Sequence, residues 1–220
     1  MPQMPLVIRS VACFVTIFSL AGMPEAARAY DVIMPSEQPA ADPAVLAPVQ
    51  ELNQALITTM RSGKTVAFQS RVDTLAPVVS RVFDLPDILR VSVGPAWASL
   101  TADQRSALLS VFRNYTVATY VDNFDSYDGQ KFTISPTTRS IGANQQVVDT
   151  EIVPRDGMPH RIDYVMRRTG AGWQIVDVLA DGSISRVAVQ RSDFASLLSR
   201  GGASALETSL QQKTQNLSRG

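Results

Sequence analysis

Side chains suited to acid–base or nucleophilic chemistry are sparse in this sequence. His160 is the only histidine and ends the turn sequence Gly157-Met-Pro-His, and no Gly-x-Ser-x-Gly motif is present. Since a serine triad requires a histidine base beside the nucleophile, His160 is better interpreted as an exposed turn residue. Asp163, Tyr164 and Asp177 could supply an acid–base pair, but adjacent residues of a strand point to opposite faces. Asp163 and Tyr164 therefore cannot act together, and we expect no catalytic residues.

Metal binding and cofactor binding have equally little support. Structural and catalytic metal sites use clustered histidine, cysteine or carboxylate ligands, whereas the only cysteine is Cys13. Asp122, Asp125 and Asp128 are closely spaced, but the glycine and glutamate positions of a calcium loop are missing. A phosphate-binding glycine motif is also missing. We interpret the three aspartates as turn and cap residues and expect neither a metal nor a cofactor.

The hydrophobic spacing indicates helices, then strands, then helices. The strongest helix signal is Thr101 followed three residues later by Gln104, which is the pattern of a capping box. The alternation that follows favours a four-stranded antiparallel meander, so the fold class is α+β. A buried Asp177 would require a partner, for which Arg167 on a neighbouring strand is a candidate. The expected helices are 49–62, 65–83 with a kink or break at Pro77, 86–93, 101–124, 192–201 and 203–217, and the expected strands are 131–135, 146–153, 161–167 and 173–179.

The first 29 residues have the three-part plan of a secretory signal peptide. Arg9 precedes an apolar run from Val11 to Ala21, and Ala27-Arg28-Ala29 supplies small residues for a signal peptidase. The run is shorter than the roughly 20 residues that cross a bilayer. We expect export, with the mature chain beginning near Tyr30. We divide the chain into a signal peptide (1–29), a Pro- and Ala-rich flexible leader (30–48) and one domain (49–220).

Charge argues against nucleic acid as a partner. The chain has 20 basic and 20 acidic residues, and removal of 1–29 leaves 18 and 19, a net charge of −1. Such a protein has no broad basic field for nucleic acid or an anionic membrane surface. A local cationic sheet edge is nevertheless a hypothesis, either for an acidic partner or a head group, or simply as a solvated edge protected by charge. Its members would be Arg139, Arg155, Arg161, Arg167 and Arg168.

The order of several segments resembles the toluene-tolerance, or MlaC-type, family of periplasmic lipid-binding proteins. The resemblance is most specific at Gly172-Trp-Gln-Ile-Val-Asp-Val178 and extends over nearly the whole mature chain. Phe83-Asp84-Leu85-Pro86 and Val178-Leu179-Ala180 are more similar to the hopanoid-associated, HpnM-type branch. The other matching segments are Trp97, Leu100–Arg105, Val111–Tyr115, Tyr127–Gly129, Asp163-Tyr164, Asp181–Ile184, Arg191–Phe194, Gly201 and Leu206.

The resemblance implies a lipid carrier that catalyses no reaction. It implies a small curved sheet of four strands wrapped by about six or seven helices, which together enclose an apolar pocket for lipid tails. The cargo would be a phospholipid or a hopanoid, moved between the inner and outer membranes in the pathway that maintains outer-membrane lipid asymmetry. The implied partners are an inner-membrane transporter complex, of the ABC or the resistance-nodulation-division type, and the membranes themselves in transient contacts.

Apolar residues of the expected helices and strands are the candidates for the lipid pocket. Each of them could equally be ordinary core, because large apolar side chains are usually buried. Two other functions stay open: an enzyme on a cone-shaped α+β fold, and an adaptor subunit of a transporter that binds no lipid. A deep apolar cavity would favour the carrier over the adaptor. The candidates are Phe83, Leu85, Ile88, Leu89, Val93, Phe112, Tyr115, Ile134, Val148, Ile152, Ile162, Tyr164, Ile175 and Val178.

Overall fold

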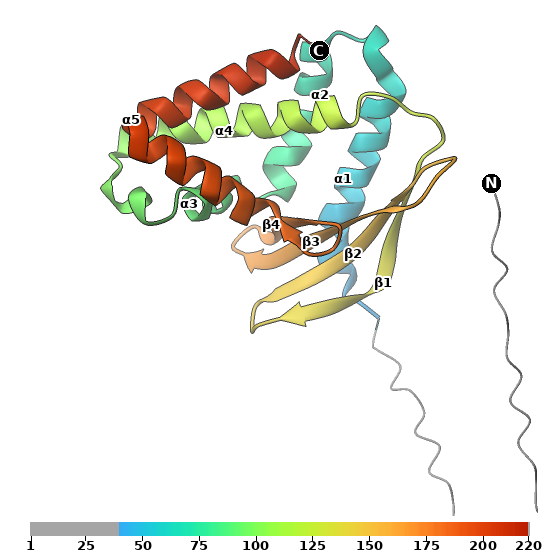
Figure 1. Ribbon diagram of the computed structural model, residues 1–220. Coiled ribbons are helices and arrows are strands. Elements are labelled where there is room, and N and C mark those ends of the chain that lie inside the picture. Colours follow the sequence, from blue (N-terminus) through green and yellow to red (C-terminus); the bar gives the residue numbers. More distant parts are fainter. Residues whose placement is uncertain (1–39, 220) are drawn as a thin grey trace, which may run out of the picture. The chain divides into compact units, whose positions relative to one another are not determined.

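A computed structural model describes residues 40–219 of the protein and contains, in that range, five α-helices and one five-stranded sheet (Figure 1). The expected signal peptide and residues 30–39 of the expected leader lie outside the described residues. The first helix, α1 (Pro43–Ser62), begins inside the expected leader, six residues before Val49. The Asp42 carboxylate accepts a hydrogen bond from the Ala44 N–H at 2.9 Å, and Val45 is fully buried. This cap, with Pro43 at the first helical position, fixes the start of α1. The Pro-rich composition of the segment had instead suggested a flexible leader.

The next helices follow the predicted spacing closely. A short 3-10 helix, η1 (Gly63–Thr65), separates α1 from α2 (Phe68–Val82), which contains Pro77 without ending there. The helix α3 (Leu85–Val93) is followed by a second 3-10 helix, η2 (Gly94–Ser99), and by the long α4 (Ala102–Asn123). The predicted capping box of α4 is confirmed, because Thr101 and Gln104 each accept a hydrogen bond from the other's backbone N–H, at 3.2 and 2.9 Å.

The sheet is an antiparallel meander, as predicted, but with five strands rather than four. In chain order these are β1 (Lys131–Ile141), β2 (Gln145–Val153), β3 (His160–Thr169), β4 (Gly172–Ala180) and β5 (Ile184–Ser185). The fifth strand has two residues, too few for an alternating pattern to reveal it. The first strand continues past Ser135 to Ile141, with a register shift around Pro136. A second shift lies opposite Val165 and Met166, and such bulges bend a strand and increase its twist.

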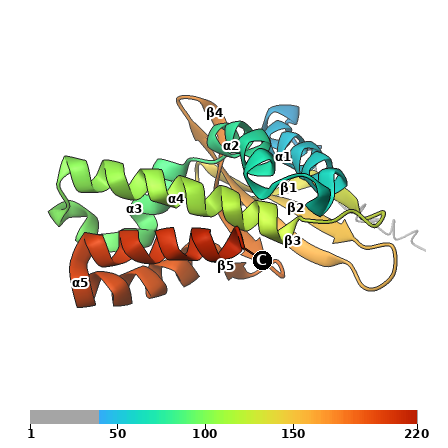
Figure 2. The ribbon, with the colours of Figure 1, turned by 90° about the horizontal axis from the view of Figure 1, so that it is seen from above.

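The C-terminal element α5 (Arg186–Leu217) consists of two helical arms joined at a kink. The backbone is non-helical at Gly201 and Gly202, where Gly202 has φ of 63°, a value that favours glycine, so the predicted break at these residues is confirmed. The second arm runs beside α4 (Figure 2), and Phe194 of the first arm contacts Phe112 of α4. With the two arms counted as one element, the described range has five α-helices rather than the expected six or seven.

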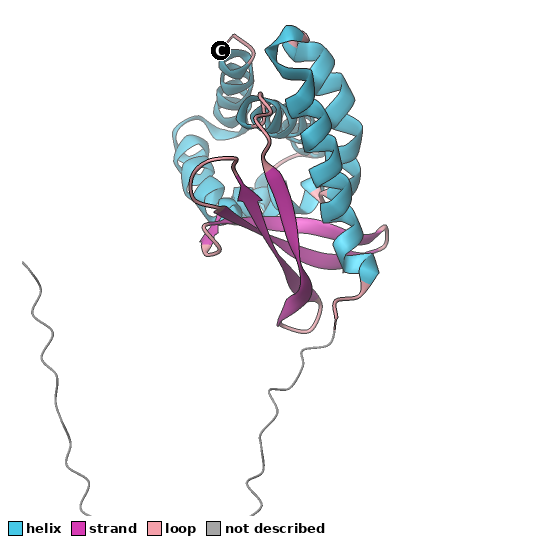
Figure 3. Cartoon of the chain, turned by 90° about the vertical axis from the view of Figure 1, so that its right-hand side faces the viewer, coloured by secondary structure: helices cyan, strands magenta, loops and turns pink. Residues whose placement is uncertain are grey.

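The helices gather on one side of the sheet (Figures 1 and 3). One buried core joins all five helices to strand residues such as Val148, Tyr164, Met166 and Ile175. Residues that alternate with these, among them Val165, form a small second cluster with Val147 and Val176 on the opposite face. The expectation that Asp163 and Tyr164 face opposite ways is therefore confirmed.

The opposite face carries an ion-pair network across three strands. Asp163 has no exposed surface and accepts hydrogen bonds from Arg139 of β1 at 2.9 Å and from Arg161 of β3 at 3.0 Å. The same two arginines also bond to Asp149 of β2, at 2.7 and 3.2 Å. Burial raises the pKa of Asp149, but the hydrogen bond and charge of Arg139 outweigh it, so the net pKa is lowered.

This network changes the interpretation of the cationic edge. Arg139 and Arg161 are paired with aspartates, and Arg167 is paired with Asp84 and Asp87. The hypothesis of a continuous cationic surface made of five arginines is wrong, because three of them are neutralised. Arg155 and Arg168 are exposed and form no ion pair with another residue between 40 and 219.

We predict that Asp163→Asn destabilises the fold. The substitution keeps the shape of the side chain but leaves two arginines without a buried counter-charge, which costs about 3 kcal/mol in comparable buried pairs. Glu151→Gln, the same chemical change at an exposed position of β2, is the control and should alter the free energy of unfolding by about 0.5 kcal/mol or less. Urea unfolding followed by circular dichroism measures both, and equal effects would contradict the structural role of Asp163.

Candidate functional site

A cavity of about 570 Å³ lies between the sheet and the helices. Its volume is within the range of roughly 300–1,000 Å³ that small-molecule sites occupy. Its walls come from the segment before α3 and from α3, α4, the start of α5 and strands β2 to β4. The lining residues are Met60, Phe83, Leu85, Ile88, Phe112, Tyr115, Thr116, Thr119, Tyr120, Asn123, Phe124, Ser126, Gln130, Ile152, Pro154, His160, Ile162, Tyr164, Asp177, Val178, Ala180, Arg186, Val187 and Gln190.

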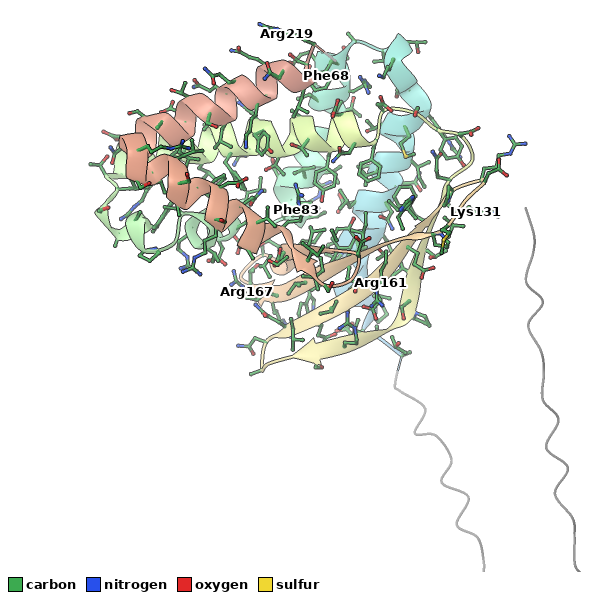
Figure 4. The ribbon with its side chains drawn as sticks, viewed as in Figure 1. Phe68, Phe83, Lys131, Arg161, Arg167 and Arg219 are labelled. Carbon is green, nitrogen blue, oxygen red and sulfur yellow. The ribbon has the colours of Figure 1, made fainter. Side chains whose placement is uncertain are left out.

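The inner wall of the cavity is apolar and aromatic. Phe83 lies between the sheet and the helices (Figure 4), and its ring centroid is 5.6 Å from that of Tyr120. Tyr120 in turn stacks on Phe124, one helical turn further along α4, with centroids 6.0 Å apart. Phe112 meets Phe194 edge to face, with centroids 6.2 Å apart. Of these rings, all but Phe194 line the cavity, and their packing against one another and against Phe194 makes the wall a rigid apolar surface.

The rim of the cavity is polar and open to solvent. Asn123 and Ser126 follow the C-terminal end of α4, His160 begins β3 and Arg186 begins α5; all four are exposed and all line the cavity. His160 is thus exposed, as predicted, yet it belongs to the cavity mouth. A site with apolar depth and a polar, wet entrance suits an amphipathic molecule, with its apolar part inward.

Asp177 has a structural role at this rim. Its carboxylate accepts hydrogen bonds from the N–H groups of Val178 at 2.7 Å and Val187 at 3.1 Å, and from the Ser185 hydroxyl. Ser185 caps α5 through the Ala188 N–H at 2.9 Å. Asp177 therefore ties the start of α5 to β4 and leaves little of its carboxylate for acid–base chemistry.

The prediction that Arg167 pairs with Asp177 is wrong. Arg167 instead donates to Asp84 at 3.0 Å and to Asp87 at 2.7 Å, which fixes α3 to β3 (Figure 4). Burial raises the pKa of Asp87, but hydrogen bonds from Arg90 and Arg167 outweigh this, so the net pKa is lowered. Sequence spacing could not reveal these pairs, because Arg167 lies 83 and 80 positions after Asp84 and Asp87.

The predicted pocket residues divide into three sets: cavity wall, core, and one residue at a separate hollow. The structure brings together in the cavity wall Phe83, Leu85, Ile88, Phe112, Tyr115, Ile152, Ile162, Tyr164 and Val178. It places Leu89, Val93, Val148 and Ile175 in the core beside the cavity. Ile134 lies at a separate, polar hollow on the sheet, next to Thr133 and Asp149. The periodicity of apolar residues cannot distinguish a residue of the cavity wall from a residue of the core, because both are apolar and occur on the same face of a helix or strand.

Sequence reasoning missed several wall residues. Tyr120 and Phe124 continue the helical stripe of Phe112 along α4, so their spacing was a usable signal. The polar rim, by contrast, is assembled from residues such as Asn123, His160 and Arg186, which are far apart in the chain and have no common motif.

Burial raises the pKa of two tyrosines that line the cavity, Tyr120 and Tyr164. It raises the pKa of Tyr164 above its ordinary value, and it raises the pKa of Tyr120, with a further increase from Tyr164 and an opposing effect from Arg186. Both phenols are therefore protonated at neutral pH and act as neutral hydrogen-bonding groups. Among residues 40–219, three or more histidine, cysteine or acidic side chains do not come together as a potential metal site, and no helix is long and apolar enough to span a membrane.

Comparison with known proteins places this geometry in a family. A family model described as "MlaC protein" matches residues 50–212, which is more than half of the chain. The protein belongs to the MlaC family. Membership confirms the resemblance seen in the sequence, while the hopanoid-associated branch stays a prediction. Membership of this family points to a binding or transport protein.

Solved structures show the same fold as this MlaC family member. Seven chains match, among them the phospholipid-binding protein from Ralstonia solanacearum, solved in complex with a phospholipid. The two proteins are 20% identical, with a TM-score of 0.69 over 80% of this chain and 99% of the other. At that identity the likeness concerns the fold. No curated protein matches the sequence significantly.

Substitutions at two adjacent residues of α3, one in the core and one in the cavity wall, should differ in their effect on stability. We predict that Leu89→Ala, at a fully buried position, lowers the free energy of unfolding by about 3 kcal/mol. Ile88→Ala should cost about half as much, because Ile88 already borders open space and its removal creates less new cavity. Urea unfolding of both variants tests this, and an equal loss would mean that Ile88 packs as an ordinary core residue.

Proposed function

We propose that this protein is a lipid carrier of the periplasm that encloses lipid tails in the cavity and leaves the head group at the polar rim. The observation that carries the proposal is the cavity itself: about 570 Å³, aromatic within and open at one side. Membership of the MlaC family and the likeness to a phospholipid-binding protein support it. The cavity also favours a carrier over an adaptor that binds no lipid, since an adaptor has no use for an open apolar interior.

The energetics of transfer fit such a carrier. Moving one methylene group from water into an apolar environment lowers the free energy by about 0.8 kcal/mol, so a two-tailed lipid does not cross an aqueous space alone. Lipid in a bilayer is already in an apolar medium, and most of the gain from tail burial cancels when the lipid moves into the protein. The carrier can therefore hold lipid firmly against water and still return it to a membrane or a transporter.

The geometry gives less support to an enzyme. Asp163, the carboxylate next to Tyr164 in the sequence, is bound to two arginines on the other face of the sheet. Asp177 lines the cavity, but it is engaged by two backbone N–H groups and a hydroxyl. The raised pKa of Tyr164 keeps the phenol protonated, so it is a poor general base at neutral pH.

The finer parts of the proposal concern cargo, route and compartment. A phospholipid or a hopanoid is the cargo, exchanged with an inner-membrane transporter and, in transient contacts, with the membranes. The signal-peptide pattern of residues 1–29 supports export to the periplasm.

Filling the cavity should abolish lipid retention. We predict that Val178→Trp, which adds a bulky ring at the cavity wall, reduces lipid carried through purification by about tenfold or more while the protein stays folded. Val189→Trp, the same change at an exposed position of α5 that is 42% accessible, is the control and should retain lipid like the wild type. Native mass spectrometry of detergent-free protein, with lipid extraction in parallel, measures the adduct. A wild-type protein that remains lipid-free even after incubation with liposomes would refute the carrier.

Export is tested separately. We expect the full chain, expressed in a host with two membranes, to accumulate in the periplasm with its mature N-terminus near Tyr30. Intact-mass measurement of the periplasmic fraction gives the cleavage site, and Phe14→Asp, which interrupts the apolar run, should leave the precursor in the cytoplasm. A periplasmic protein that keeps residues 1–29 would show that the segment is not a cleaved signal.

A further inference from the structure

Two hydroxyl groups inside the cavity have no hydrogen-bond partner among residues 40–219. Tyr120 of α4 and Tyr164 of β3 both line the cavity, and Tyr164 is only 2% exposed. Neither phenol forms a hydrogen bond with another residue in the described range, and neither oxygen is among the side-chain atoms sealed from any accessible space. Each hydroxyl therefore opens into the cavity. Since buried polar groups in proteins are almost always hydrogen-bonded, a pair of open hydroxyls in an apolar wall requires an explanation.

Packing does not explain the two hydroxyls. The ring of Tyr120 is held by Phe83 and Phe124 through its faces, contacts that a phenylalanine would make equally well. Tyr164 belongs to the same buried core as its neighbours. When a hydrocarbon guest displaces solvent from the cavity, a hydroxyl without a partner costs free energy, so phenylalanine would serve better at both positions if the cavity held only hydrocarbon.

The two phenols line the same cavity as a cation, Arg186. Burial raises the pKa of Tyr120, the Tyr164 phenol adds to that rise and the Arg186 guanidinium opposes it. Arg186 is exposed at the cavity mouth and forms no ion pair with another residue of the described range. The wall thus presents a cation at its exposed mouth, and inside it the hydroxyls of the half-buried Tyr120 and the buried Tyr164 among aromatic and aliphatic side chains.

This order matches the chemistry of an ester-linked phospholipid. In such a lipid the phosphate is followed, a few bonds along each chain, by an ester carbonyl, and only then by the apolar tail. A carbonyl oxygen accepts hydrogen bonds and a protonated phenol donates them. A fused-ring hydrocarbon with its polar group at one end has no acceptor at the depth of the phenols.

We propose that Tyr120 and Tyr164 form a subsite that donates hydrogen bonds to an ester carbonyl of an acyl phospholipid. The inference rests on the proposed carrier function and narrows its cargo to ester-linked lipids. The subsite recognises the linkage between head group and tail, and the rest of the cavity accepts any tail that fits.

Two phosphatidylethanolamines with identical chains, one diester and one diether, test the subsite. The mature protein is incubated with vesicles that contain equal amounts of both lipids, and native mass spectrometry reads the ratio of bound species. We expect the wild type to prefer the diester by roughly tenfold, the equivalent of one to two net hydrogen bonds. In Tyr120→Phe/Tyr164→Phe the preference should fall to about twofold or less, through loss of diester binding.

Tyr127→Phe is the control for the double variant. Tyr127 is exposed and lies outside the cavity wall, so this variant should keep the wild-type preference. If the wild type retains both lipids without preference, the subsite is overturned and the carrier function stands. If the wild type retains neither lipid, the carrier function itself fails. If the wild type prefers the diester and the folded double variant keeps that preference, the preference comes from other groups and the assignment to the two tyrosines is wrong.

Discussion

The structure depends on holding two layers together around a space that neither layer fills. Close packing stabilises an ordinary core across its whole width, but side chains on opposite walls of an open cavity do not touch and gain no dispersion energy from each other. The walls must therefore be fixed where they meet, at the edges. In this protein a buried apolar core joins the helices to the sheet beside the cavity, and hydrogen bonds and ion pairs fix the edges of the cavity itself.

Two such joints define the cavity. At one, the Asp84 N–H donates to the Ile175 carbonyl at 3.0 Å, and Arg167 binds Asp84 and Asp87, so α3 is attached to β3 and β4. At the other, Asp177 holds the first turn of α5 against β4. Both joints are made of polar groups, which gives the acidic residues beside the apolar site a structural role. The third polar cluster, around Asp163, stabilises the sheet from its opposite face.

The limits of prediction from sequence follow from this design. Strong local patterns were sufficient for α4, whose cap and stripe lie within one stretch of chain, and for the meander, whose strands follow each other directly. Local patterns failed at β5, which is too short to alternate, and at α1, where Asp42 and Val45 override a composition typical of a leader. The cavity could be anticipated only as a set of apolar positions. Whether Ile88 or Leu89 faces the open space depends on a gap between layers, and Arg167 pairs with residues 80 and 83 positions away. Periodicity could therefore predict neither feature.

The free energy of tail burial also bears on which lipids the cavity selects. If most of the free energy of tail burial cancels between bilayer and protein, the apolar wall contributes little to the choice among lipids, because specificity is a difference of affinities. The few polar groups inside the cavity then carry a share of discrimination far larger than their number suggests. Unpaired phenols at Tyr120 and Tyr164 stabilise neither the empty fold nor a pure hydrocarbon guest. The two phenols contribute favourably to binding only when a bound lipid places hydrogen-bond acceptors next to them. The cavity wall therefore discriminates among lipids at these two positions and accepts any apolar tail elsewhere.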